Sequence, residues 1–491
     1  MQENSYGISG ISAYVPPYRV NLESWCGWTG NNWDKTRTVI GRSFRMRGPE
    51  HSVYTMAANA VLRLIDSYAI DPRNIGYLAL GTESSIDNAA GAVIVRGLVD
   101  RALQAEGHQR LARDCEVPEL KHACLGGIYA IKGALRYLAF DGHGRQAIVV
   151  SADIAEYARG SSGEPTQGAG AIAMLLEQSP TLLTLDLHGA GSASDYRGLD
   201  FRKPFLRFSG QSPGHNGRLK DLPIFNGKYS TTCYVDESLH ALDAMFAKRQ
   251  GSRSAYFRDL ACVFMHRPYH RMPHSALALG YLFALGQDGG DAHRELEAYC
   301  AAANIALNDL LSEMNSHPDV ARLEGGDLSF EAYPLSMLAL KAFRETETHR
   351  QVVEAKMQLG SDAMMDLGNL YTAAMPAWLA AGLDQAAKQN AELDGREMLL
   401  MGYGSGDAAE AIPARIVSGW KRHAVKIKFN AALDHPVDLE LTQYQALHDG
   451  RIAGNLQPAP PQGFIVDRIG TRDERQFQDY GIEYYRYVGM P

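Results

Sequence analysis

The sequence has few cysteines, and their spacing argues against two kinds of site. Its six cysteines stand at positions 26, 115, 124, 233, 262 and 300, and no two form a CxxC pair. Zinc sites and dithiol redox sites commonly use closely spaced cysteines, so we expect neither here. Six cysteines in 491 residues are also too few for a disulfide framework. The cysteine content therefore indicates a protein of a reducing compartment.

The chain also lacks a basic excess, a secretory leader and a membrane-spanning run. Its formal net charge is −8, and it has no basic stripe that could displace counterions from a nucleic acid. Residues 1–12 do not have a basic segment followed by an apolar run. No apolar stretch approaches the roughly 20 residues that cross a bilayer. We therefore predict a cytoplasmic protein that binds neither nucleic acid nor membrane.

Short apolar runs alternate with longer helical stretches, which predicts an α/β fold with buried strands. The predicted strands of the first half are 75–80, 146–150 and 171–176, and those of the second half are 260–265 and 398–401. We expect helices over 126–140 and over 368–383, where Pro376 marks a first turn or a kink. The two halves match loosely in pattern, which indicates an internal duplication.

The composition divides the chain into four regions. These are an N-terminal half at 1–188, a connecting region at 189–254, a C-terminal half at 255–456 with a polar helical insertion at 288–355, and a tail at 457–491. The connecting region begins with a stretch rich in Gly, Ser, Asp and Pro, which is typical of loops that line active sites. The insertion could be a dimer surface, a docking surface for a carrier protein, or an elaboration without a role. Nothing in the sequence decides whether the tail covers an active site.

Cys124 stands directly before a predicted helix, in the segment ELKHACLGG. The positive end of a helix dipole lowers the pKa of a thiol placed there, so we expect a reactive thiolate. Gly126 and Gly127 would let backbone N–H groups approach an acyl oxygen. A small buried cysteine before a helix is the other interpretation of the same pattern.

Two ionisable residues follow predicted strands, where α/β proteins place catalytic groups. Glu83, in GTESSID, would be a general base if burial raised its pKa, or else an acid that starts the next helix. His266 could be an acid, a base or a donor to an oxyanion, or else a satisfied half-buried histidine. Asn369 in GNLYT and Ser405 in GYGSG add neutral hydrogen-bonding groups, although GYGSG lacks the spacing of a nucleotide-binding loop.

Taken together, these segments resemble the hydroxymethylglutaryl-CoA (HMG-CoA) synthase family of the thiolase superfamily, from about residue 7 to about residue 451. The matching stretches are GTESSIDNAA, ELKHACLGG, SADIAEYA with PTQGAGA, LDFRKP, PIFNGKYS with CYVDESLHALD, FMHRPYHRM, GNLYTAA and GYGSGDAAE. The resemblance implies a thiolase-like, five-layered αβαβα fold with two pseudo-duplicated halves. It also implies a homodimer that uses CoA thioesters as substrates and needs no metal or other cofactor.

The resemblance implies a role for each candidate residue. Cys124 would take the acetyl group of acetyl-CoA, and Glu83 would remove a proton from its methyl group. The carbanion would attack the C3 ketone of acetoacetyl-CoA, which His266 orients and polarises, and hydrolysis would release HMG-CoA. The remaining positions that match the family's substrate-binding residues are Asn369, Ser405, Gly404, Tyr371, Asp153, Asp200, Arg271 and Lys228.

The sequence departs from the family pattern at several positions. Leu125 replaces a usual Tyr, Asn226 replaces a usual Asp, and His274 with Ser275 replaces a basic pair that helps hold the phosphates of CoA. Three functions therefore stay open. The first is an HMG-CoA synthase that uses free CoA thioesters, and the second is a β-branching relative that acts on thioesters of an acyl carrier protein. The third is a non-catalytic scaffold subunit, which the retained Cys124, Glu83 and His266 disfavour.

Overall fold

A large mixed sheet forms the centre of the molecule in this computed structural model, which describes residues 5–86, 88–203, 222–224, 226–316, 318, 320–327, 329–451, 456 and 462–491. The strands follow the order β10-β11-β12-β8-β1-β7-β6-β4-β5, with β9 beside β12. Their bounds are β1 Tyr6–Tyr14, β4 Ile75–Gly81, β5 Glu119–Leu120, β6 Gln146–Ala155, β7 Gly168–Gln178, β8 Leu183–Leu185, β9 Gly191–Ser194, β10 Cys262–Met265, β11 Glu397–Gly404 and β12 Ala408–Ile416. β4 runs parallel to β5 and β6, and β10 runs parallel to β11.

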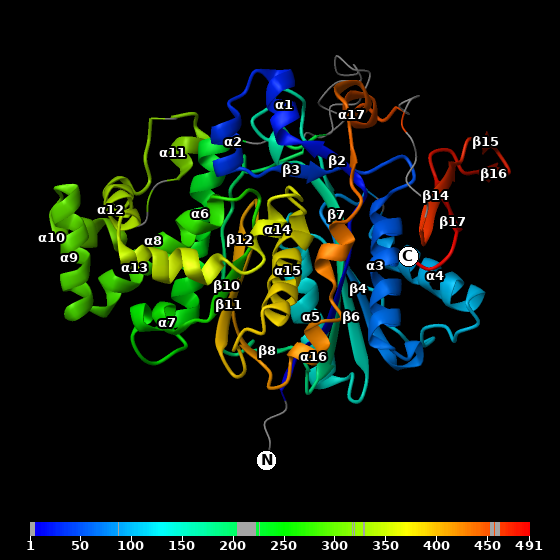
Figure 1. Ribbon diagram of the computed structural model, residues 1–491, viewed down its shortest axis with the longest axis horizontal. Helices are drawn as coiled ribbons and strands as arrows, with labels where there is room; N and C mark the ends of the chain where they lie inside the picture. The colour runs from blue at the N-terminus through cyan, green and yellow to red at the C-terminus, as the bar shows by residue number, and fades with distance from the viewer. Residues whose placement is uncertain are drawn as a thin grey trace.

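The helices complete five layers. α5 (Gly126–Phe140) contacts β4, β6 and β7, and α15 (Ala374–Lys388) contacts β10 and β11, so these two helices lie between the two halves of the sheet. α3 (Val53–Tyr68) and α4 (Gly91–Ala105) cover the outer face of the N-terminal half. α6 (Gly227–Phe246) and α8 (Met272–Asp288) cover the outer face of the C-terminal half (Figure 1). The αβαβα arrangement that we predicted is confirmed.

Local sequence explains why the main elements form where they do. β4 is buried along its whole length, as expected of a parallel strand covered by helices on both faces. α3 begins with a capping box in which Ser52 and Thr55 each bond the other's backbone N–H. Pro376 lies in the first turn of α15, where a proline has no hydrogen bond to lose.

The insertion is helical and lies at one side of the molecule. It consists of α9 (Asp291–Ala303), α10 (Leu307–Met314), α11 (Ala321–Glu324), α12 (Pro334–Arg344) and α13 (Glu347–His349), followed by a π-helical turn at Arg350–Glu354 and a 3₁₀ turn at Ala355–Met357. Of these, α9, α10 and α12 pack against α8 (Figure 1, left). α7 (Arg253–Asp259) precedes β10, and α14 (Ser361–Met364) precedes the central α15.

A smaller unit and the tail lie outside the five layers. A three-stranded sheet joins β2 (Tyr18–Asn21), β3 (Ser43–Arg45) and β13 (Val437–Asp438), beside α1 (Leu22–Thr29), α2 (Trp33–Val39) and α17 (Leu441–His448). In the tail, β14 (Phe464–Ile469) pairs with β17 (Glu483–Tyr487), and β15 (Asp473–Glu474) pairs with β16 (Phe477–Gln478). Buried Asn59 of α3 holds Phe464 through two hydrogen bonds of 2.7 and 3.2 Å, so the tail packs on α3. The short α16 (Lys421–Ala424) contacts α15 and β1.

Among the helices that the structure describes, none has an apolar run sufficient to traverse a bilayer.

Candidate active site

The candidate residues lie where strands of the two halves end, on both sides of the central helices. β4 ends at Gly81, just before Glu83, and β10 ends immediately before His266. Cys124 lies between β5 and α5, while Asp153 belongs to β6. Because α/β sheets place ligands beyond the carboxyl ends of parallel strands, this convergence marks a candidate active site.

Cys124 lies in a buried aromatic environment. Its exposed fraction is 7%, and it packs with Tyr157, Tyr371, Ala155 and the partly buried Phe201. The three rings meet edge to face, with centroid distances of 5.3 Å for Phe201 and Tyr371 and 5.9 Å for Tyr157 and Phe201. Such a wall excludes water from the thiol, and it would protect an acyl-cysteine from early hydrolysis.

Our expectation of a low pKa for Cys124 is wrong. Burial raises the pKa of this thiol well above its usual value, and the carboxylates of Glu83, Asp153 and Asp200 raise it further. α5 begins at Gly126, so its dipole does act on the thiol, but a helix end contributes only about 0.3–1 kcal/mol at an exposed site. Desolvating a charge costs several kcal/mol. The resting residue is therefore a neutral thiol that must lose its proton as it attacks.

Asp153 is fully buried and fixes the loop that carries Glu83. Its Oδ1 accepts hydrogen bonds from the backbone N–H groups of Glu83 and Ser84, at 2.8 and 2.9 Å, and from the hydroxyl groups of Thr82 and Ser84. Its Oδ2 accepts from the N–H of Thr372 at 2.9 Å and from the Thr372 hydroxyl at 2.5 Å. Asp153 therefore joins the Glu83 loop of the N-terminal half to the segment that leads into α15.

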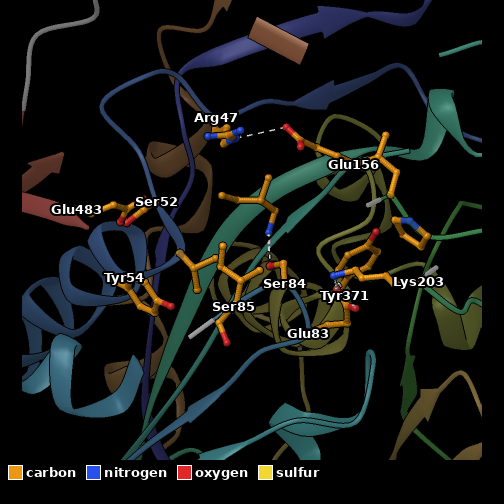
Figure 2. Close-up of a pocket in the computed structure, with 15 residues that line it drawn as sticks. Arg47, Ser52, Tyr54, Glu83, Ser84, Ser85, Glu156, Lys203, Tyr371 and Glu483 are labelled. Carbon is orange, nitrogen blue, oxygen red and sulfur yellow. Dashed lines mark hydrogen bonds and ion pairs between the residues drawn. The ribbon is translucent and has the colours of Figure 1, made fainter. Parts of the chain in front are cut away.

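Glu83 lines a cavity of about 270 Å³. Its side chain is 12% exposed and forms an ion pair of 3.1 Å with Lys203. Tyr371 lines the same cavity and also packs against Cys124, so it links the carboxylate to the thiol. Figure 2 shows Glu83, Lys203 and Tyr371 together at one side of the cavity. The further lining residues are Arg47, Ser52, Val53, Tyr54, Ser84, Ser85, Ile86, Ile154, Glu156, Leu222, Pro223 and Glu483.

Burial raises the pKa of the Glu83 carboxyl, which meets the condition that the sequence analysis set for a general base. The nearby Lys203 lowers it and so offsets part of the rise, while Asp153 raises it again. A carboxylate with a raised pKa accepts a proton more readily than an exposed one, which suits a general base.

Replacing Lys203 with methionine is expected to move the pH dependence of catalysis. Because the ammonium group lowers the pKa of Glu83, its loss leaves that pKa higher. A base acts only when deprotonated, so the rising limb of the pH–kcat profile should shift to higher pH. The pH profile of the variant checks this, with K248M as the control, because Lys248 bonds the Ala190 carbonyl group away from the cavity. An unchanged rising limb in K203M would contradict the electrostatic role.

His266 is buried and neutral. Burial lowers its pKa to about 3, so the ring carries no charge at physiological pH. Its backbone N–H donates to the Met401 carbonyl group at 2.8 Å, and the Tyr234 hydroxyl donates to the His266 carbonyl group at 2.8 Å. Among the described residues, Nδ1 has no hydrogen-bond partner. A neutral imidazole held in this way can donate one hydrogen bond to a substrate oxygen.

Asn369 shapes the backbone next to Cys124. It is buried, and its Oδ1 accepts a hydrogen bond of 2.9 Å from the N–H of Tyr371. Tyr371 has a φ of 46°, and two more non-glycine residues of the site, Ala123 and Phe201, have φ values of 40° and 53°. Left-handed backbone at non-glycine residues is uncommon and gathers at functional sites.

Asp200 and Ser405 form a polar layer beside His266. The Tyr403 hydroxyl donates to Asp200 Oδ2 at 2.7 Å, and its ring stacks on His266 with centroids 6.4 Å apart. Burial raises the pKa of Asp200, and the neighbouring hydroxyl groups of Ser230, Tyr403 and Ser405 lower it. The Asp200 carboxylate also raises the pKa of the Cys124 thiol, so this layer connects the histidine to the nucleophile.

Gly404 lets β11 pass directly beside the Cys124 loop. A Cβ atom at this position would lie 2.7 Å from the His122 carbonyl oxygen and 2.7 Å from the Leu125 Cβ atom. Any side chain would push the nucleophile's loop away.

Arg271 and Lys228 do not line the Glu83 cavity. Arg271 lies on the surface at the start of α8, where its Nε donates to the Thr38 carbonyl group of α2 at 3.3 Å. Lys228 forms an ion pair of 2.9 Å with Glu331 of the insertion. These two cations therefore lie outside the described lining of the Glu83 cavity.

Several residues of the site had no role assigned from the sequence. Phe201 and Lys203 belong to LDFRKP, a stretch that carried the family resemblance, so a signal was present. Tyr157 and Thr372 lie in matching stretches too, but nothing in their identity shows that they surround Cys124 or bond Asp153. Glu483 of the tail lines the cavity, so the tail forms part of the wall of the candidate site.

In the described part of the chain, no three His, Cys, Asp or Glu side chains are grouped as metal ligands.

Comparisons with known proteins point to one family. The family profiles described as hydroxymethylglutaryl-coenzyme A synthase N terminal and C terminal match residues 2–180 and 300–446. A hydroxymethylglutaryl-CoA synthase of Haloferax volcanii is 27% identical over 434 residues, which span 87% of this chain and 88% of the relative.

Solved structures show the same fold. The structure described as MvaS in complex with 3-hydroxy-3-methylglutaryl coenzyme A has a TM-score of 0.74 at 24% identity, and covers 99% of this chain and 100% of its own. The curacin biosynthetic pathway HMG synthase in complex with acetyl donor-ACP has a TM-score of 0.68 at 17% identity, with the same coverage. The two family profiles together match about two thirds of the chain. The protein therefore belongs to the HMG-CoA synthase family.

Proposed function

We propose that the protein is an acyltransferase that condenses acetyl-CoA with acetoacetyl-CoA to give HMG-CoA and free CoA. The observation that carries the proposal is the pairing of a buried thiol and a largely buried carboxylate across Tyr371, which contacts Cys124 and lines the Glu83 cavity. This arrangement supplies a nucleophile that can hold an acyl group and a base beside that group.

The first step loads the enzyme. The Cys124 sulfur attacks the acetyl carbonyl carbon, the bond from that carbon to the CoA sulfur breaks, and the thiol proton leaves on CoA. The buried, neutral thiol must be deprotonated during this attack. Backbone N–H groups at the start of α5, which directly follows Cys124, would donate to the oxyanion that forms.

The second step forms the carbon–carbon bond. The Glu83 carboxylate removes a proton from the methyl group of acetyl-Cys124, and the resulting carbanion adds to the C3 ketone of acetoacetyl-CoA. Neutral His266 donates a hydrogen bond to that ketone oxygen. The proton that Glu83 removed passes to this oxygen, which becomes a hydroxyl group, and Glu83 returns to its carboxylate form. Water then cleaves the bond between the acyl group and Cys124, which releases HMG-CoA and restores the thiol.

Steady-state assays with free thioesters test the proposal. Acetyl-CoA with acetoacetyl-CoA should give HMG-CoA and one CoA per turnover, detected by liquid chromatography and mass spectrometry.

A second candidate function is β-branching on a carrier-bound β-ketoacyl thioester. The observation that favours this candidate is the Lys228–Glu331 ion pair, because it engages a cation that could otherwise meet the phosphates of CoA. The curacin synthase, which shares the fold, has been solved in complex with acetyl donor-ACP. Rapid turnover with carrier thioesters and none with free CoA thioesters would select it.

We also propose a cytoplasmic homodimer. Ile86 lines the Glu83 cavity yet is 94% exposed, and Val93 in the first turn of α4 is 53% exposed. Large apolar side chains so placed are typical of a surface that a second subunit covers. Light scattering coupled to size-exclusion chromatography should give twice the mass of the chain, and a monomeric mass would contradict the proposal.

A further inference from the structure

The segment 195–203, which follows β9, carries three residues of the candidate active site. Asp200 lies in the polar layer, Phe201 in the aromatic wall of the nucleophile, and Lys203 beside Glu83. The segment is neither helix nor strand, so its geometry depends on the contacts that its residues make. Phe201 also has left-handed backbone, which persists only where the surroundings hold it. Some other group must therefore keep the segment in place.

Arg197 attaches the segment to the rest of the C-terminal half. Its Nη2 donates to Asp236 Oδ2 of α6 at 2.6 Å and lies 3.9 Å from Glu237 Oε2. Its Nε lies 3.7 Å from Asp407 Oδ2, at the start of β12. The backbone N–H of Arg197 donates to the Gly406 carbonyl group at 2.9 Å. One residue thereby joins the segment to α6 and to the turn between β11 and β12.

The guanidinium group faces three acids that are buried, namely Asp236, Glu237 and Asp407. Among the residues that the structure describes, no other arginine or lysine forms an ion pair with these acids. Burial raises the pKa of Glu237 to about 7 and the pKa of Asp407 to about 9, and Arg197 lowers both values. Removing one partner of a buried ion pair leaves an uncompensated charge, so the loss of Arg197 should displace the groups around it.

The insertion supports the same attachment. The hydroxyl group of buried Tyr333, directly before α12, donates to Asp236 Oδ1, while Arg197 donates to Oδ2 of the same carboxylate. Apolar contacts accompany this bond, since Cys233 of α6 packs with Leu323 of the insertion. In Figure 1, α6 lies between the insertion and β12. The Asp236 carboxylate therefore connects the insertion to the active-site segment.

We infer that Arg197 is a positioning residue of the reaction, which holds the segment 195–203 over the acyl group on Cys124. The inference rests on the proposed function and goes beyond it, because it gives Arg197, and the insertion through Tyr333, a role in retaining that group. With Phe201 displaced, water attacks the carbonyl carbon of acetyl-Cys124 before the acceptor arrives. The bond from that carbon to sulfur breaks, acetate leaves, and the thiol regains its proton.

Alkylation of Cys124 in the full-length protein tests this role without any turnover. We expect R197M to raise the rate at which iodoacetamide labels Cys124 about tenfold, because the segment no longer covers the thiol. Peptide mapping by mass spectrometry gives the rate. The matched control is R253M, because Arg253 pairs with Asp243, an acid further along α6. Equal labelling of Cys124 in R197M and the control would overturn the inference.

Other cysteines distinguish local opening from unfolding. Cys262 of β10 and Cys300 of α9 are also buried, and in R197M they should stay unlabelled while Cys124 reacts. If all three label together, R197M is unfolded, and D236N decides instead. Asparagine keeps the size of Asp236 but loses its charge and one acceptor oxygen, so D236N should raise labelling of Cys124 by a smaller factor. Labelling of D236N at the wild-type rate would then overturn the inference.

The fate of the acetyl group connects this role to catalysis. With both thioesters present, R197M should release about tenfold more acetate per HMG-CoA formed than the wild-type protein, since water reaches the acyl group. R197K keeps a cation beside the acids and should restore most of the wild-type ratio, and R253M should not change it. An unchanged ratio in R197M would show that Arg197 does not retain the acyl group, and would overturn the inference. If R197M exposes Cys124 as predicted but the wild-type protein forms neither acetyl-enzyme nor HMG-CoA, the positioning role stands and the proposed function is wrong.

Discussion

Replacing Glu83 with glutamine is expected to slow carbon–carbon bond formation by about 10²–10⁴-fold, the range that a positioned general base contributes. Glutamine keeps the size and the hydrogen-bonding capacity of the side chain but cannot accept the methyl proton. Acetylation of Cys124 does not use this base, so its rate should change little. Rapid-quench measurement of acetyl-enzyme formation, beside steady-state formation of product, separates the two steps.

The control for this variant is E297Q, which alters an exposed carboxylate of α9. It should behave as the wild-type protein in both steps. If E83Q lost acetylation as completely as condensation, Glu83 would act in loading, and its assignment as the base of the second step would be wrong.

Replacing Asp153 with alanine is expected to lower the free energy of unfolding by about 3 kcal/mol or more. The change leaves the backbone N–H groups of Glu83, Ser84 and Thr372 without their acceptor, and each unpaired buried donor costs about 1–3 kcal/mol. Asparagine retains one acceptor oxygen, so D153N should lose less. Urea unfolding followed by circular dichroism gives both values.

A second measurement shows that Asp153 acts by positioning the base. D153N should reduce kcat for condensation more than it changes KM, because the Glu83 loop loses its anchor while the substrate contacts stay. D473A serves as the control, since Asp473 is exposed in β15 of the tail. A D153N variant as stable and as active as the control would show that the Asp153 network does not hold the site.

The sequence predicted the strands and helices whose patterns depend on neighbouring residues. The strands expected at 75–80 and 260–265 are β4 and β10, and the helices expected at 126–140 and 368–383 are α5 and, in large part, α15. Buried strands and regularly spaced apolar helix positions depend on neighbouring residues, so one chain suffices to recognise them. The polar insertion is helical, as its composition indicates.

The electrostatics of the site could not be predicted in the same way. The position of Cys124 before α5 suggested a low pKa, but the pKa is set by burial and by carboxylates that come from three distant segments. Likewise, the six hydrogen bonds of Asp153 join residues from two halves of the chain. The Tyr333–Asp236 contact crosses from the insertion to α6. Such contacts depend on tertiary packing, for which a local pattern carries no signal.

The most direct test of the account is to locate the acyl group on the protein. Brief incubation with acetyl-CoA, followed by intact mass measurement and peptide mapping, should show one acetyl group on the peptide that contains Cys124, and none on C124A. Addition of acetoacetyl-CoA should remove that group and produce HMG-CoA. An acetyl group on another residue, or no loading from either CoA or carrier thioesters, would contradict the assignment of Cys124 as the nucleophile.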